Sequence, residues 1–129
     1  MANQFVVQLK NEPGAMATLA EALAARGVDL RAIGGGGIGD SGHVIMTTAD
    51  DDTTKQILDE GGYTYIEGES ILAEVDDRPG GMAALSRQLA DAGVNIYGHL
   101  FLGRWGDRAM FAFVVDDPDK ARPILERKR

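Results

Sequence analysis

Two loops in this sequence combine proline and glycine with polar side chains, in a setting that favours binding of a small anion. Asn11-Glu12-Pro13-Gly14 and Asp77-Arg78-Pro79-Gly80-Gly81 each follow a strand-like apolar run and precede an apolar helical pattern. The first amides of such a helix lack partners within the helix. They carry the positive end of the helix dipole and suit a carboxylate. Gly80 and Gly81 would also let the backbone approach a ligand closely, because glycine has no side chain.

One further polar residue follows each helix. Asn95 has donors and an acceptor, so it can satisfy a carboxylate and an ammonium group together, whereas Asp29 only accepts and favours ammonium. The site centred on residues 77–82 and Asn95 is therefore predicted to be the better equipped. The structural alternative is a helix start led by proline, a tight glycine turn, and an asparagine that turns the entry of a strand.

A glycine run, Gly34-Gly35-Gly36-Gly37-Ile38-Gly39, matches the G-x-G-x-x-G pattern but does not predict a dinucleotide site. That motif must open a helix, and the residues that follow, 40–46, are turn-like and then strand-like. Two interpretations stay open. One is a strand without side chains that pairs closely or leaves room for a ligand, and the other is a bulged, loose edge strand.

The remaining polar residues do not form a catalytic or metal-binding set. The aspartates at 50–52 and 116–117 are each predicted to cap a helix. A metal site at 50–52 is disfavoured, because adjacent carboxylates on an extended chain point in alternate directions. His43 and His99 have no partner close in sequence. Arg78 with Asn95 is the pair that acylphosphatase-like chemistry would need, and that hydrolase is the least favoured alternative. We expect no enzyme activity, no metal and no cofactor.

The composition is that of an acidic globular protein. The 129 residues carry a net charge of −7, which disfavours nucleic acid and anionic membrane as partners. There is no cysteine, which excludes disulfides, thiolate metal sites and cysteine nucleophiles. No apolar stretch approaches the roughly 20 residues of a membrane helix, and the first residues do not resemble a signal peptide. A cytoplasmic protein is expected.

A repeat of 66 residues organises the chain. Between residues 13–30 and 79–96, 9 of 18 pairs are identical, including the proline and glycine of the two loops. The same offset, without a gap, aligns Gly37 with Gly103 and Asp50 with Asp116. We interpret the repeat as a duplication, because chance rarely matches apolar, glycine and proline positions together.

Each copy predicts the same order of elements. Strands are predicted over 5–9 and 71–75, and apolar spacing predicts a helix after each loop, with Met16 and Met82 on the core-facing stripe. Second strands are expected to begin at Val28 and Val94. Further elements are a third strand over 43–49 or 108–115 and a second helix over 53–60 or 118–128. A fourth strand, over 63–67, is expected in the first copy alone.

The predicted fold is α+β, with two ferredoxin-like βαββαβ units in tandem and the last strand missing from the second. The predicted domains are residues 1–68 and 69–129. The missing strand would leave an unpaired sheet edge, which we expect another segment or another chain to cover. Because each unit is small, a homodimer is expected.

The loop and strand motifs resemble those of the ACT domain. Asn11 to Gly14 with Gly27-Val28-Asp29-Leu30 carries the resemblance in the first copy, and Asp77 to Met82 with Gly93-Val94-Asn95-Ile96 carries it in the second. The resemblance implies a tandem regulatory protein that binds a small amino acid or related metabolite at the interface between paired units. Family members use the backbone amides of the first loop and a polar side chain at the start of the second strand.

The implied ligand-binding residues come from both copies. They are Asn11, Gly14, Ala15, Met16, Asp29, Leu30, Asp77, Gly80, Gly81, Met82, Asn95 and Ile96. The alternative from a different class is a regulatory or interaction subunit of a metabolic enzyme, acting on a partner enzyme without a ligand of its own.

Overall fold

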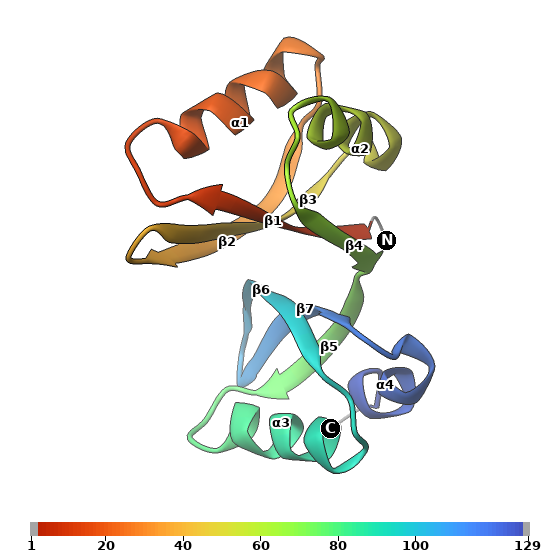
Figure 1. Ribbon diagram of the computed structural model, residues 1–129. Coiled ribbons are helices and arrows are strands. Elements are labelled where there is room, and N and C mark those ends of the chain that lie inside the picture. Colours follow the sequence, from red (N-terminus) through yellow and green to blue (C-terminus); the bar gives the residue numbers. More distant parts are fainter. Residues whose placement is uncertain (1–2, 128–129) are drawn as a thin grey trace. The chain divides into compact units, whose positions relative to one another are not determined.

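The protein, in a computed structural model that describes residues 3–127, divides between Gly68 and Glu69 into two compact units. In each unit, two helices lie on one face of a β-sheet (Figure 1). Both units are α+β and follow the ferredoxin-like order of elements, so the predicted fold class is confirmed.

The first unit contains a four-stranded sheet and two helices. Its elements are β1 (Asn3–Lys10), α1 (Ala15–Ala25), β2 (Leu30–Ile38), β3 (Ser41–Thr48), α2 (Asp51–Glu60) and β4 (Tyr65–Glu69). The strand order is β2-β3-β1-β4, and β3 pairs antiparallel with both β1 and β2. The glycine-rich strand β2 therefore lies at one edge of the sheet.

The second unit contains a three-stranded sheet and two helices within the described residues. Its elements are β5 (Ile71–Asp76), α3 (Gly81–Asp91), β6 (Ile96–Trp105), β7 (Arg108–Val115) and α4 (Pro118–Leu125). The strand order is β5-β7-β6, with both pairs antiparallel. No counterpart of β4 is present up to residue 127, as predicted, and β5 is an edge strand. The predicted end of α4 at Lys128 lies outside the described residues.

The second strand of each unit begins two residues later than predicted. The amide of Val28 donates to the carbonyl oxygen of Leu23 at 3.0 Å, and the amide of Val94 donates to that of Leu89 at 2.9 Å. The glycines just before these valines have φ angles of 71° and 76°, which suit the end of a helix. Both valines are buried. They complete the helix end and fill the core instead of entering the sheet.

Each unit has its own apolar core between the sheet and the helices. Phe5, Leu19 and Leu58 are fully buried in the first unit. Leu125 and Phe113 are buried in the second. These residues lie at the apolar positions of the alternating strand pattern and of the helical spacing. The amphipathic patterns therefore determine which face of each helix packs against which face of the sheet.

The repeat is not gapless in three dimensions. Phe5 pairs with Met46, whereas Ile71, which is 66 residues after Phe5, pairs with Phe113, which is 67 residues after Met46. A register shift in β6 between Phe101 and Gly103 takes up the extra residue as a bulge. The predicted gapless alignment is therefore wrong beyond that bulge.

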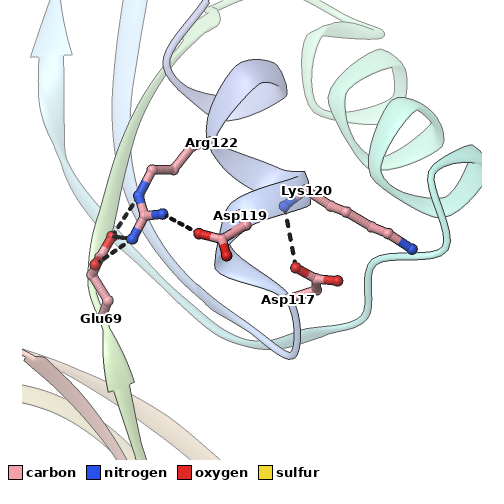
Figure 2. A network of polar contacts seen from close by, with 5 residues as sticks. All are labelled: Glu69, Asp117, Asp119, Lys120 and Arg122. Atoms are coloured by element: carbon pink, nitrogen blue, oxygen red, sulfur yellow. Dashed lines mark hydrogen bonds and ion pairs between the residues drawn. The ribbon is translucent and has the colours of Figure 1, made fainter.

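The extra residue also changes which aspartate caps a helix. Asp50 caps α2 by accepting a hydrogen bond from the Thr53 amide at 3.0 Å, and Asp117 caps α4 in the same way (Figure 2). Asp116, the predicted counterpart of Asp50, instead accepts a hydrogen bond from the Asn95 amide at 2.8 Å. The cap prediction thus holds for Asp50 and Asp117 and is wrong for Asp116.

Arg122 connects helix α4 to Glu69, the residue at which the second unit begins. Figure 2 shows its guanidinium group against the carboxylate of Glu69, at donor–acceptor distances of 2.5 to 3.0 Å, and 2.7 Å from Asp119. The hydrogen bonds to Glu69, and then those to Asp119, raise the pKa of Arg122. This bidentate geometry suits a planar guanidinium group, which a lysine would not reproduce.

Candidate ligand-binding site

The two predicted loops adopt the same backbone conformation at the end of a strand. Gly14 and Gly80 each have a φ angle of 90°, a left-handed value that glycine adopts without strain. Each is the N-cap residue of the helix that follows. The Pro-Gly pair therefore determines where α1 and α3 begin.

Helices α1 and α3 start without a side-chain cap, whereas aspartates cap α2 and α4. Among residues 3–127, the amides of Met16 and Ala17 in α1 have no hydrogen-bond acceptor, and neither do those of Met82 and Ala83 in α3. These N–H groups lie at the positive ends of the two helix dipoles. They are donors that an anion can use.

The first polar residue of each loop is engaged within its own unit. Asn11 donates from Nδ2 to the carbonyl oxygen of Gly39 at 2.9 Å, which ties the loop to the turn between β2 and β3. Asp77 accepts a hydrogen bond from Nε of Arg104 at 2.8 Å. Both side chains thus help to hold their loops in place, and each loop also presents its unpartnered backbone amides to a ligand.

Gly81 has a structural reason to be glycine. A Cβ atom at this position would lie 2.1 Å from the carbonyl oxygen of Asp76. The close packing of the helix start on the strand end therefore explains the residue type, and access for a ligand is not needed to explain it. The corresponding residue of the first unit is Ala15.

Asn95 lies far from the loop of its own unit. Strand β5 ends at Asp76, which pairs with Arg108, whereas β6 begins at Ile96, which pairs with Val115. Those two partners are the ends of β7, roughly 23 Å apart at about 3.3 Å per residue. The register of the first unit separates Asp29 from its loop in the same way.

The predicted residues thus form two groups at opposite ends of each sheet. The loop group is Asn11, Gly14, Ala15, Met16, Asp77, Gly80, Gly81 and Met82, and the strand group is Asp29, Leu30, Asn95 and Ile96. In the strand group, the two apolar residues pack against the cores. Asp29 is 3.4 Å from Arg31, and Asn95 is exposed. Neither unit brings its loop group and its strand group together by itself.

The first unit has a cleft beside its loop. Its volume is about 380 Å³, and it lies between the start of α1 and strands β1, β2 and β3. Three predicted residues, Asn11, Ala15 and Met16, line it. Met16 is 36% exposed, so its prediction as a core residue is wrong, whereas Met82 packs against the core of the second unit.

Sequence reasoning missed most of the other walls of this cleft. Leu9, Ile33 and Val44 contribute apolar walls, and the glycines at 34–36 form the adjoining strand surface. The glycine run was the available signal, and room beside it was one of its two interpretations. The remaining wall residues could not be chosen from the sequence, because they depend on the register that places β2 beside β3.

The corresponding groove of the second unit is more polar. It has a volume of about 340 Å³, and Asp77, Met82 and Arg104 are among its walls. The ion pair between Asp77 and Arg104 therefore lies at this groove, and the guanidinium carbon of Arg104 is 4.7 Å from the ring centre of Phe101. The groove is partly occupied by the side chains of the unit itself.

Comparison with known proteins finds a family match in the first unit. Residues 4–60 match the family model of the ACT domain. This match confirms the resemblance to the ACT domain that the loop and strand motifs of the first copy carry. No curated protein matches the chain.

Several solved structures share the fold over nearly the whole chain. A protein from Bacteroides thetaiotaomicron has a TM-score of 0.71 and 21% identity, covering 97% of this chain and 86% of that one. The ligand-free regulatory subunit of aspartate kinase from Thermus thermophilus has a TM-score of 0.62 and 20% identity, covering 97% and 87%. The regulatory subunit of aspartate kinase from Thermus flavus has a TM-score of 0.64 and 18% identity, covering 98% and 92%. At these identities the likeness shows the fold.

Two features are absent from residues 3–127. None of the helices there has the length and apolar character needed to cross a bilayer, and no group of three metal-ligating side chains comes together. The two histidines have different surroundings, since His43 lines the cleft and the ring of His99 lies 6.2 Å from that of Phe113.

Proposed function

We propose that this protein is an amino-acid-binding regulatory protein without catalytic activity of its own. The observation that carries the proposal is the pair of uncapped helix starts, each placed by a Pro-Gly loop and each with unpartnered amides. The α-carboxylate of an amino acid is an anion suited to such donors. The ACT family of residues 4–60 and the regulatory role named for the two Thermus structures support the same proposal.

We further propose residues 1–68 and 69–129 as two ACT-like domains, with the ligand bound where ACT-like units meet. The loop group and the strand group lie at opposite ends of each sheet, so only a neighbouring unit can bring a strand-group side chain to a loop. Asn95 would then bond both the ammonium and the carboxylate group of the ligand, and Asp29 the ammonium group.

The proposal includes a homodimer. Strand β5 is at the edge of its sheet, and Leu72 on this strand is 42% exposed. An edge of this kind is normally covered or blunted, because its backbone groups can pair with another strand. Sedimentation velocity should give twice the mass of one chain, and a monomer at micromolar concentration would contradict this part of the proposal.

A second candidate is a regulatory subunit that acts on a partner enzyme without a ligand of its own. The fold that this chain shares with regulatory subunits of aspartate kinase favours it. An acylphosphatase-like hydrolase has no such support. Arg78 and Asn95 lie at opposite ends of their sheet, and Arg78 is paired with Asp76 at 3.2 Å.

A thermal-shift screen of the twenty common amino acids tests the first candidate. A ligand at 100 times its dissociation constant should add about 2.7 kcal/mol to the free energy of unfolding. The carboxamide of the same amino acid should give a much smaller shift, because it lacks the anion. If none of the twenty changes the melting temperature, the second candidate is favoured.

Asn95→Ala should reduce the shift while leaving the melting temperature of the free protein nearly unchanged. The Asn95 backbone is bonded to Asp116, but its side chain is exposed and makes no hydrogen bond within the described structure. Lys55→Ala, on the exposed face of α2, is the matched control and should leave the shift intact. An unchanged shift in Asn95→Ala would remove Asn95 from the site.

A further inference from the structure

The two units carry different side chains at the same position of the sheet. In the first unit Val44 pairs with Val7 on one side and with Gly35 on the other. In the second unit the same ladder position is occupied by Phe111, which pairs with Phe101. A glycine and a valine thus stand where the other unit has two phenylalanines.

The two phenylalanine rings fill space in the second unit. Their centroids are 5.5 Å apart in a tilted arrangement, and Phe111 also packs against the core of that unit. Met82, on the helix above, packs against the same core. The two rings thus cover the sheet at this ladder position, and the groove of about 340 Å³ beside the loop has Met82 and Phe111, but not Phe101, among its walls.

The first unit has no ring at this ladder position. The cleft of about 380 Å³ lies there, with Val44 and Gly35 among its walls. Met16, the counterpart of Met82, is 36% exposed, and Ile33 beside it is 48% exposed. Exposed apolar side chains around a concave surface are typical of a site that a ligand covers.

We propose that this cleft binds the side chain of an aromatic amino acid, whose ring takes the place that Phe101 and Phe111 occupy in the second unit. The inference rests on the proposed function and specifies its ligand class. A cleft of this volume holds an amino-acid-sized molecule, and a methionine sulfur packs favourably against an aromatic ring. The loop with the unpartnered amides forms one wall of the cleft, so the head group and the ring of one ligand lie within reach of it.

The geometry also assigns one such site to each chain. The second unit has its own rings at this ladder position, its groove is more polar, and its loop carboxylate, Asp77, is bonded to Arg104. A ligand ring could lie at this ladder position in the second unit only by displacing Phe101. The first unit is therefore the binding unit for the ring, although residues 77–82 were predicted to be the better-equipped loop.

Calorimetric titration with L-phenylalanine, L-tyrosine, L-tryptophan, L-leucine, L-threonine and L-lysine tests the ligand class. We expect an aromatic amino acid to bind with one site per chain, and the three others to bind about ten- to a hundredfold more weakly, because they bury less apolar area. Equal or tighter binding of leucine, threonine or lysine would overturn the inference and leave the proposed function standing.

Indole, which has a ring but no head group, separates the inference from the proposed function. If indole shifts the NMR signals of Met16 and Ile33 while no amino acid binds, the cleft prefers rings and the proposed amino-acid function is overturned. If neither indole nor any amino acid binds, both are overturned.

Two variants that fill the cleft with a larger side chain test whether the ligand binds there. Val44→Phe recreates Phe111 and should abolish binding of the aromatic amino acid. Because Val44 is buried and the larger ring can disturb folding, Ile33→Trp provides a second plug from an exposed wall. Lys55→Phe, on the exposed face of α2 and outside the cleft, is the control and should bind normally. Folded plug variants that bind as tightly as the unmodified protein would overturn the assignment.

Discussion

The start of α3 lies so close to the end of β5 that a Cβ atom on Gly81 would be 2.1 Å from the carbonyl oxygen of Asp76. Gly81→Ala should therefore force the helix and strand apart and lower the free energy of unfolding by about 1–3 kcal/mol, the usual cost of overpacking. Urea denaturation monitored by far-UV circular dichroism measures this loss.

Gly36→Ala is the matched control for that substitution. A Cβ atom on Gly36 would meet no atom within 4 Å, and the residue has no positive φ angle. We expect its free energy of unfolding to change by less than about 0.5 kcal/mol, as for most surface substitutions. Equal stabilities of the two alanine variants would contradict a steric role for Gly81.

The phenol of Tyr65 should keep its proton to a higher pH in the folded protein than in the unfolded chain. Its hydroxyl donates to Oδ1 of Asp59 at 2.6 Å. This hydrogen bond is the largest cause that raises the pKa of Tyr65 from 10.0 to about 12. Absorbance titration at alkaline pH, restricted to the range where circular dichroism shows a folded protein, should contain a step near pH 12 that Tyr65→Phe removes. Tyr97→Phe should retain that step.

The same pKa shift has a consequence for stability. A raised pKa means that the folded state holds the phenol proton more tightly than the unfolded chain does. The stabilisation by Tyr65 is therefore complete below pH 10 and is lost as the pH rises through about 12. The difference in the free energy of unfolding between the unmodified protein and Tyr65→Phe should shrink over this window. A constant difference would show that the hydrogen bond to Asp59 does not raise the pKa of Tyr65.

Much of the fold could be predicted from the sequence because its signals are local. The spacing of Leu19 and Leu23 identifies the buried face of α1, and the Pro-Gly loops mark where two helices begin. Asp50 as a cap follows from its position before a helical pattern. The start of a strand is harder to predict where the preceding residue completes a helix end. Val28 has a strand-like side chain, but its amide closes the end of α1 just before β2.

The candidate site could be predicted only in part, because its geometry depends on pairing register. The loop motifs indicated the helix starts, but not that Asn95 would lie at the other end of the sheet. The bulge between Phe101 and Gly103 adds a residue that sequence comparison alone did not reveal. Met16 has the spacing of a core residue, but it is 36% exposed and lines the cleft together with Gly35.

The proposed ring site makes a prediction for the second unit. Replacing Phe101 with Gly and Phe111 with Val gives that unit the residues that the first unit has at the same ladder position. The double variant should enlarge the groove next to Met82 at this ladder position, and the number of aromatic ligands bound per chain should rise from one to two. Tyr97→Ala, which removes an exposed ring elsewhere on β6, should still bind one. A folded double variant that binds a single ligand would show that the two rings do not occupy the space that a ligand ring takes in the first unit.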